Sequence, residues 1–274
     1  MPLDHGVIGQ EGPAYERTWT AKDTMLYALG VGAGTSELEF TTEKGQRVLP
    51  TFAVLAAQAP GRRLGDFDRA MLVHAEQAFE LFRELPPAGG VRTSSTVTGI
   101  YDKGSGALVT TEARAVDLET GEPVVVSRSA VFIRGEGGFG GERGPRDDWT
   151  PPGRAPDHKI TYATRPEQAL VYRLSGDYNP LHSDPEFAAR AGFDRPILHG
   201  LCTYGVTGRA LLHAVAGSDP ARFRAMSGRF TSPVFPGEAL TVSIWADGPD
   251  VLFRTAKDDG TVVIDRGRAT VAPA

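Results

Sequence analysis

Runs of β-branched and apolar residues interrupted by polar ones predict strands in both halves of the chain. Two of the runs lie before residue 135 and are separated by a turn that contains Gly121, and two near the C-terminus are separated by a turn that contains Gly260. Glycine in a short turn between such runs is typical of a β-hairpin. The predicted strands are residues 107–117, 123–132, 223–230, 239–246, 251–256 and 261–272.

Helical patterns precede these strands. Residues 197–215 form an apolar stretch with a broad hydrophobic face, which predicts a long helix that ends near Gly217. A shorter helix is expected over residues 20–30. A similar helix is expected within residues 163–176, with Pro166 at its first position.

The order of these elements predicts one architectural unit that occurs twice. A long helix followed by antiparallel strands that wrap it is the plan of an α+β unit with a curled sheet. Two such units side by side would share one continuous sheet. Between them, residues 135–156 are rich in glycine and proline, which predicts a flexible linker without regular structure. We therefore expect units at residues 1–134 and 157–274, joined by this linker.

Composition places the chain among ordinary globular proteins. Its 274 residues are 41% hydrophobic and 23% charged, which suffices for two domains with buried cores. The net charge of −5 and the lack of a basic run argue against nucleic acid as a partner. Cys202 is the only cysteine, which excludes an internal disulfide and favours a reducing compartment. Neither a signal peptide nor an apolar run of about 18 residues is present, so we expect a cytoplasmic protein without a membrane span.

The densest group of chemically useful side chains lies on a predicted loop after residue 175. Gly176 permits a sharp exit from the preceding helix, and Pro180 disfavours helical geometry at the residue before it. Asp177, Asn179 and His182 are therefore expected on an ordered loop, where their side chains can converge. The alternative is that Asp177 and Asn179 only cap turns, as these residue types often do, and that His182 is a surface histidine.

The longer string around these residues resembles the signature of the hydratase 2 group of MaoC-like dehydratases, which fixes Gly176, Asp177, Asn179, Pro180 and His182. Segments in both halves add to the resemblance, namely residues 49–52, 72–77, 102–106, 184–193, 196–205 and 229–238. The similarity therefore covers most of the chain. It implies an α+β double hot-dog fold, with two antiparallel curled sheets that each wrap a central helix.

The resemblance also implies an activity. This is the reversible hydration of a trans-2-enoyl-CoA to a (3R)-3-hydroxyacyl-CoA in fatty-acyl metabolism, without a metal or redox cofactor. Such a reaction needs a base for the attacking water, an acid for the α-carbon, and a group that holds negative charge on the thioester oxygen. Asp177 and His182 can supply the first two by acting on one shared water, while Asn179 orients the water or the carboxylate. The acyl-CoA is the expected partner, and the family implies a homodimer.

The third requirement points to Gly200, at the predicted start of the long helix. There an unpaired backbone N–H and the positive end of the helix dipole can hold the thioester oxygen. Local sequence alone equally allows a glycine that only permits tight packing, and the resemblance decides between the two. Further positions match acyl-CoA contacts of the family: His74, Ala75, Lys103, Tyr178, Pro180, Leu181 and Phe230. Ala75 departs from the family pattern, which usually has glycine there.

The first half lacks the catalytic signature. Residues 29–34, at the corresponding place, include neither an acidic residue nor a histidine. We therefore expect one active site per chain, with the first half accommodating the acyl chain.

Other functions remain as alternatives. A hot-dog acyl-CoA thioesterase would direct a carboxylate-activated water at the thioester carbonyl, and a non-catalytic acyl-CoA-binding subunit would need no acid–base pair. Nucleophilic catalysis by Ser175, Ser183 or Cys202 is disfavoured, because no Gly-x-Ser-x-Gly turn frames them. A metal site formed by His182 and Asp184 lacks a convincing third ligand nearby.

Overall fold

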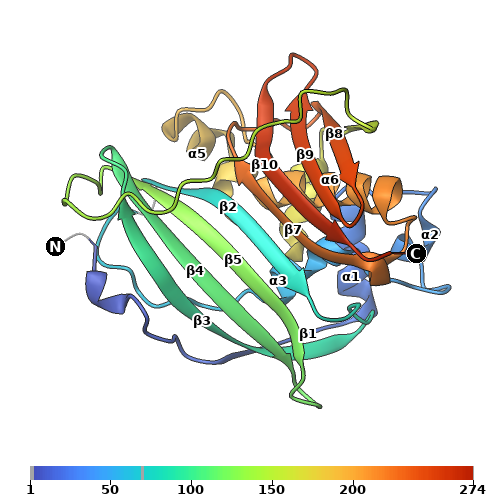
Figure 1. The fold of residues 1–274 in the computed structure, drawn as a ribbon, viewed down its shortest axis with the longest axis horizontal. Coiled ribbons are helices and arrows are strands. Elements are labelled where there is room, and N and C mark those ends of the chain that lie inside the picture. The colour runs from blue at the N-terminus through green and yellow to red at the C-terminus, as the bar shows by residue number, and fades with distance from the viewer. Residues whose placement is uncertain (1–2, 69–70, 274) are drawn as a thin grey trace.

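The computed structural model describes residues 3–68 and 71–273, and the ten strands of that part form one antiparallel sheet (Figure 1). The strands of the first half are β1 (Tyr15–Trp19), β2 (Leu72–Leu81), β3 (Gly89–Asp102), β4 (Gly106–Asp117) and β5 (Pro123–Arg134). Those of the second half are β6 (His158–Ala163), β7 (Phe223–Phe230), β8 (Ala239–Asp247), β9 (Asp250–Lys257) and β10 (Val262–Val271). Every strand predicted from the sequence is present, with small shifts at the ends.

The order of the strands is the same in both halves. From its outer edge inward, the first half runs β1-β3-β4-β5-β2, and the second half runs β6-β8-β9-β10-β7. The halves meet where β2 pairs with β7, and Glu76 lies opposite Arg229 across this junction. The shared order confirms the expected repeat and the single continuous sheet, which is the arrangement of a double hot-dog fold.

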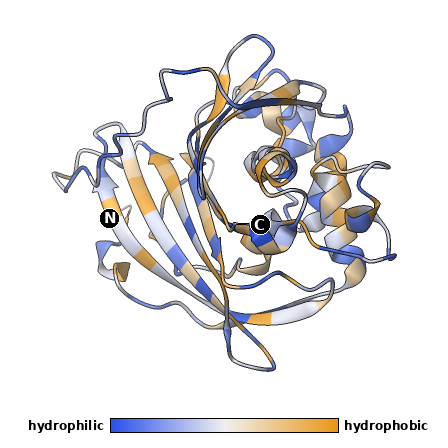
Figure 2. Ribbon diagram, turned by 45° about the vertical axis from the view of Figure 1, so that its right-hand side comes forward, coloured by the Kyte–Doolittle hydropathy of each residue, from blue (hydrophilic) through white to orange (hydrophobic). Residues whose placement is uncertain are grey.

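The second half contains the long central helix that the apolar pattern predicts. This helix is α6 (Gly200–Val215), and the sheet of the second half curls around it (Figures 1 and 2). The other helices are α1 (Ala21–Gly30), α2 (Leu38–Thr41), α3 (Ala53–Ala56), α4 (Gln168–Tyr172) and α5 (Pro185–Arg190). Short 3-10 turns are η1 (His5–Val7), η2 (Pro50–Phe52), η4 (Arg173–Ser175), η5 (Pro180–His182) and η6 (Pro220–Arg222). In the described residues, no helix is both long and apolar enough to cross a membrane.

The central helix of the first half is much shorter than its counterpart. At the matching place in the chain, before β2, the helical elements among the described residues are η2 and α3. Pro60 and Gly61 follow closely. Proline restricts the residue before it, and glycine commonly ends helices, so the chain does not continue as a helix there. The expected helix at the centre of the first half is therefore reduced to a short segment.

The helix expected within residues 163–176 is also shorter than predicted. It is divided into α4 and η4, and Pro166 lies before both. The cause is a contact with a distant part of the chain, because the backbone N–H and the hydroxyl of Thr164 both donate to the carbonyl of Glu238. These bonds hold the chain to the start of β8 and delay the first helical turn.

The linker lacks helix and strand, as predicted, but it is anchored to the sheet rather than flexible. It crosses one face of the sheet between β5 and β6 (yellow-green in Figure 1). The carboxylate of Asp102 accepts hydrogen bonds from the backbone N–H groups of Gly138 and Gly140. The buried indole of Trp149 donates to the carbonyl of Gly267 on β10. A tryptophan within a stretch of glycines and prolines was the sequence signal for this anchoring.

Candidate active site

The predicted catalytic loop lies between α4 and α6 and is built from short capped turns. Gly176 ends η4 with φ 118°, a left-handed conformation that favours glycine. The side chain of Asn179 accepts a hydrogen bond from the backbone N–H of Leu181. Asp177 accepts one from the N–H of Asn179 through a single carboxylate oxygen. Both residues therefore cap turns, as the simpler alternative expects, but these bonds leave the second oxygen of Asp177 free.

Three side chains converge at this loop, those of Asp177, His182 and His199. A carboxylate oxygen of the first and a ring nitrogen of each histidine all lie within 4.8 Å of one another. His182 is 9% exposed and His199 is 1% exposed, and their stacked rings have centroids 3.7 Å apart. Asp177 is exposed to solvent. The loop thus places an accessible carboxylate beside a mostly buried imidazole, as acid–base chemistry on a shared water requires.

One hydrogen bond defines which nitrogen of His182 is free. Its Nδ1 lies 2.9 Å from the backbone carbonyl of Ile197, which can only accept, so Nδ1 carries the proton of the neutral ring. Nε2 then holds the lone pair and can accept a proton. Burial lowers the pKa of His182, although the hydrogen bond at Ile197 and the carboxylate of Asp177 oppose this shift. The lower pKa keeps the ring neutral, which is the form that a base needs.

The same three side chains offer metal-ligand atoms, but their geometry does not favour a metal site. A histidine binds a metal through a lone pair in the plane of its ring, and rings inclined by only 28° are poorly placed to direct theirs at one ion. Asp184, considered as a ligand beside His182, instead caps α5 by accepting the N–H groups of Glu186 and Phe187. The group is therefore better suited to proton transfer than to coordination.

Gly200 is the first residue of α6, so its backbone N–H has no acceptor within the helix. Phe230 on β7 lies beside it, and a methyl group at Gly200 would be 3.5 Å from the ring. The ring of His74 on β2 lies 5.0 Å from that of Phe230, centroid to centroid. Burial lowers the pKa of His74, against the opposing effects of its hydrogen bonds and of Asp177. The site is thus completed at the junction of the two halves.

Three other predicted contacts lie on the catalytic loop itself. Tyr178 is 57% exposed, and the guanidinium of Arg173 lies 4.9 Å from the centre of its ring. Pro180 is exposed and begins η5, in which Leu181 is half-buried. These side chains form the outer surface of the loop, where they can contact a bound molecule.

Two predicted contacts come from the first half. Ala75 is half-buried at an irregularity in the pairing of β2 with β5, beside His74. Lys103, at the turn between β3 and β4, donates to the carbonyl of Arg143 in the linker. It also borders a groove of about 630 Å³ between the sheet and the linker, together with Arg146. The side chain of Lys103 is therefore positioned by the linker, and it is not part of the group formed by Asp177, His182 and His199.

Residues 29–34 of the first half pack against the second half. The carbonyl of Gly30 accepts hydrogen bonds from the side chain of Gln168 and the thiol of Cys202. A methyl group at Gly30 would come within 3.2 Å of Tyr172, so glycine permits the close approach of α1 and α4. Cys202 is fully buried, and burial raises the pKa of its thiol, which does not suit a nucleophile.

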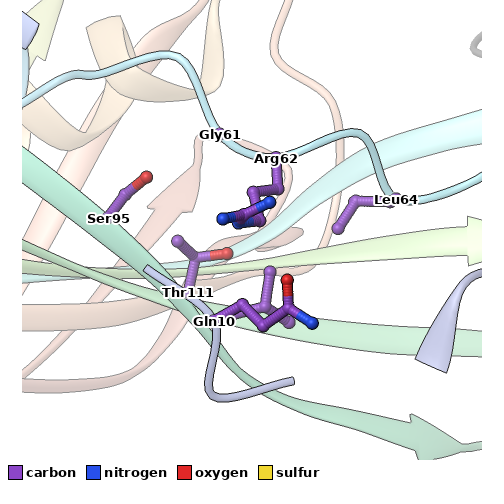
Figure 3. A pocket seen from close by; sticks show the side chains of 7 residues that line it. Gln10, Gly61, Arg62, Leu64, Ser95 and Thr111 are labelled. Atoms are coloured by element: carbon purple, nitrogen blue, oxygen red, sulfur yellow. The ribbon is translucent and has the colours of Figure 1, made fainter. Parts of the chain in front are cut away.

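Two hollows flank the catalytic loop. One, of about 590 Å³, is lined by Asn179, Leu72 and residues 61–67. The other, of about 160 Å³, lies against the first half; it is lined by Arg17, Thr18, Trp19, Asp23, Leu26, Phe52, Leu55, Leu174 and Ser175. A smaller cavity of about 70 Å³ lies within the first half, where Arg62, Ser95 and Thr111 line it (Figure 3). Of these three hollows, the first is lined in part by Asn179 of the loop, and the second by Leu174 and Ser175, which directly precede the loop.

Comparison with known proteins agrees with this geometry. Residues 17–135 match the MFE-2 hydratase 2 N-terminal domain, and residues 148–266 match the MaoC like domain. The chain is 47% identical to the 3-hydroxyacyl-thioester dehydratase Y of Mycobacterium tuberculosis, over 97% of this chain and 98% of that protein. The chain belongs to the MaoC-like dehydratase family.

Other members of the family show the same similarity over most of their length. The peroxisomal enoyl-CoA hydratase 2 of Arabidopsis thaliana is 40% identical to this MaoC-like dehydratase, over 91% of this chain and 89% of that protein. The crystal structure of a MaoC-like dehydratase from Phytophthora capsici matches with a TM-score of 0.90 and 35% identity, over 98% of both chains. The resemblance that the loop signature indicated is therefore confirmed.

His199 is the member of the central group that the sequence did not single out in this MaoC-like dehydratase. Two signals were available for it. It directly precedes Gly200, and it occupies the N-cap position of α6, where serine, threonine, aspartate or asparagine is usual. Its side chain makes no cap hydrogen bond, so it is available for other contacts.

Proposed function

We propose that this MaoC-like dehydratase catalyses the reversible hydration of trans-2-enoyl-CoA thioesters to (3R)-3-hydroxyacyl-CoA thioesters. The observation that carries the proposal is the convergence of the Asp177 carboxylate and His182, close to the free backbone N–H at the start of α6. The relatives support it, because an enoyl-CoA hydratase and a 3-hydroxyacyl-thioester dehydratase are named for the two directions of one reaction.

In the hydration direction, Asp177 and His182 hold one water, and Nε2 of His182 is the ring atom that can accept its proton. The water oxygen bonds to the β-carbon, and the π electrons move towards the thioester carbonyl. The N–H of Gly200 donates to the carbonyl oxygen as negative charge builds there. The acid–base pair returns a proton to the α-carbon, so one water is added in total. Asn179 keeps its amide N–H₂ free to orient the water or Asp177.

The rest of the acyl-CoA extends from this point along both halves. The acyl chain enters the hollow of about 160 Å³ against the first half. The first half then binds the substrate and contributes no catalytic acid or base. His74, Ala75, Tyr178, Pro180, Leu181 and Phe230 surround the thioester end. Lys103, beside a groove that also contains Arg146, pairs with the CoA phosphates. Hydration leaves the oxidation state unchanged overall, so the reaction needs no redox cofactor, and the acid–base pair performs it without a metal in this proposal.

The cellular setting is part of the same proposal. We place the protein in fatty-acyl metabolism, including β-oxidation, as a cytoplasmic homodimer. The sequence contains a single cysteine, Cys202, which fits a reducing compartment.

A ladder of trans-2-enoyl-CoA substrates of increasing chain length tests the proposal. The purified protein should remove the enoyl absorbance while the thioester stays intact, and the product should be the (3R) alcohol. Chiral chromatography of the product after release from CoA measures the stereochemistry. An (S) product would contradict the site geometry, and release of free CoA would favour a thioesterase.

Replacement of Gly200 by proline should lower kcat by about 10²–10³-fold, because it removes the N–H that holds the thioester oxygen. Proline is well tolerated at the first position of a helix. His199 already has φ −59° and ψ 135°, which suits a residue before proline. Stopped-flow or steady-state hydration rates measure the effect.

Gly200→Ala is the matched control for this change. It keeps the N–H, and its methyl group would make an ordinary contact with Phe230 at 3.5 Å. Its kcat should stay near that of the unsubstituted protein. Equal rates for the proline and alanine variants would remove Gly200 from the mechanism.

A further inference from the structure

We propose that His199 is a positioning residue of the acid–base site, a role that rests on the proposed hydratase activity. It holds the main chain of Asp177, supports the ring of His182, and leads directly into the N–H of Gly200. The catalytic signature does not include it, and its assignment comes from the contacts of its ring.

The first contact fixes the tautomer of His199. Its Nε2 lies 3.2 Å from the backbone carbonyl of Asp177, which can only accept, so Nε2 carries the proton. Nδ1 then holds a lone pair, and this buried atom has no hydrogen-bond partner among the described residues. Protonation of Nδ1 would leave a buried N–H unsatisfied, which is unfavourable. His199 is therefore a neutral donor to the catalytic loop.

The second contact orients His182. The two rings are stacked with centroids 3.7 Å apart and planes inclined by 28°. His199 is 1% exposed, and the ring of Tyr172, itself 2% exposed, lies 4.9 Å from it. A ring that is packed this closely has little freedom to turn. It therefore supports the face of His182, whose Nδ1 is already held by Ile197.

The third relation is covalent. His199 is the N-cap of α6, and Gly200 is its first helical residue. His199, which holds Asp177 and supports His182, thus also fixes the position of the backbone N–H of Gly200. Displacement of reacting groups by about 1 Å can cost on the order of 100-fold in rate. One side chain in this position is able to set all three parts of the site relative to one another.

The surroundings keep His199 uncharged. Burial and the neighbouring His182 lower the pKa of His199 to about 4, with Arg173 acting in the same direction and Asp177 in the opposite one. Tyr172 packs against it, and burial raises the pKa of this phenol well above its ordinary value. At neutral pH no positive charge on His199 competes with proton transfer to His182.

Three variants separate the contacts. His199→Gln keeps an N–H donor near the position of Nε2, His199→Phe keeps a flat ring for stacking, and His199→Ala removes both. We expect kcat to fall on the order of 100-fold in the alanine variant and on the order of 10-fold in each of the others. KM should change little, because His199 is buried and has almost no surface that a substrate could contact. His158→Ala, on an exposed edge strand, is the control and should match the unsubstituted rate.

The pH profile provides a readout that a purely structural role would not move. Removal of the ring in His199→Ala admits water beside His182, relieves its burial and raises its pKa. The acid limb of kcat/KM should therefore move to higher pH in this variant and remain in place in His199→Phe. An alanine variant with an unchanged kcat and an unmoved acid limb would overturn the proposal.

A measurement on the unsubstituted protein needs neither activity nor a folded variant. Nitrogen-15 NMR of the histidine rings at neutral pH should show His199 neutral with its proton on Nε2, and His182 neutral with its proton on Nδ1. A charged His199, or one protonated on Nδ1, would overturn the positioning role even in an active hydratase. Absence of hydration by a protein with the expected tautomers would instead count against the proposed function.

Discussion

Asp177→Asn is expected to lower kcat for enoyl-CoA hydration by about 10²–10⁴-fold, the usual contribution of a positioned acid or base. The substitution keeps a side-chain oxygen for the N–H of Asn179, so the turn at the start of the loop is preserved. What it removes is the negative charge and the proton acceptor beside His182. Initial rates followed by the loss of enoyl absorbance measure the effect, and KM should change much less.

Two further variants make this result specific. His182→Gln should show a comparable loss, because it removes the lone pair of Nε2. Asp194→Asn changes an exposed carboxylate that follows α5 and should leave the rate unaltered. If Asp177→Asn and His182→Gln both turned over at the unsubstituted rate, the acid–base assignment would be wrong.

Glu37→Gln is expected to destabilise the fold by about 3–5 kcal/mol, because it leaves a buried charge without its partner. The carboxylate of Glu37 accepts hydrogen bonds from Nε of Arg209 at 3.0 Å and from Nη2 at 2.6 Å. His213 contributes a third bond through Nε2 at 2.8 Å. The side chains of Glu37 and Arg209 are 9% and 4% exposed, and they join the first half to α6. Unfolding in urea measures the loss of stability.

The same carboxylate makes stability depend on pH. Although burial acts to raise the pKa of Glu37, hydrogen bonds from His213 and Arg209 lower it from 4.5 to about 2. A group with a lower pKa in the folded state stabilises the fold above its unfolded-state pKa and loses this effect as the pH falls towards the folded value. The contribution of Glu37 to the free energy of unfolding is thus present above pH 4.5 and is lost as the pH falls from 4.5 to about 2.

The substitution should therefore remove part of the loss of stability in this acidic range. Glu119→Gln, at an exposed turn between β4 and β5, is the control and should behave as the unsubstituted protein does. The double variant Glu37→Gln with Arg209→Met should lose less than the sum of its single changes, because no charge is then left unpaired. An unchanged urea midpoint for Glu37→Gln would show that the buried pair is not needed.

The strands and the catalytic loop could be predicted because they depend on neighbouring residues. The turns at Gly121 and Gly260 separate runs that pair with each other, and no distant contact is needed to recognise them. Gly176 and Pro180 likewise shape the loop through their own backbone preferences. The signature around them then indicated the family and the fold, which the comparisons confirm.

Features that depend on residues far apart in the chain could not be predicted in the same way. His199 becomes part of the site only when α6 brings it against His182, and the stacking of two rings leaves no periodic signal. The pairing of Glu37 with Arg209 joins segments from different halves. The anchoring of the linker depends on where Trp149 meets β10. The prediction of a long central helix in the first half was wrong for a local reason, since Pro60 and Gly61 lie just beyond α3.

The pairing of β2 with β7 has a consequence for how such a protein can change over time. Identical strand orders on either side of this pair make the chain equivalent to a symmetric dimer whose subunits are covalently joined. In a dimer of identical subunits, every mutation appears twice. Here each copy is encoded separately, so one can lose a helix or adapt to a larger ligand while the other keeps its reactive groups. Fusion thus allows the two copies to divide their tasks.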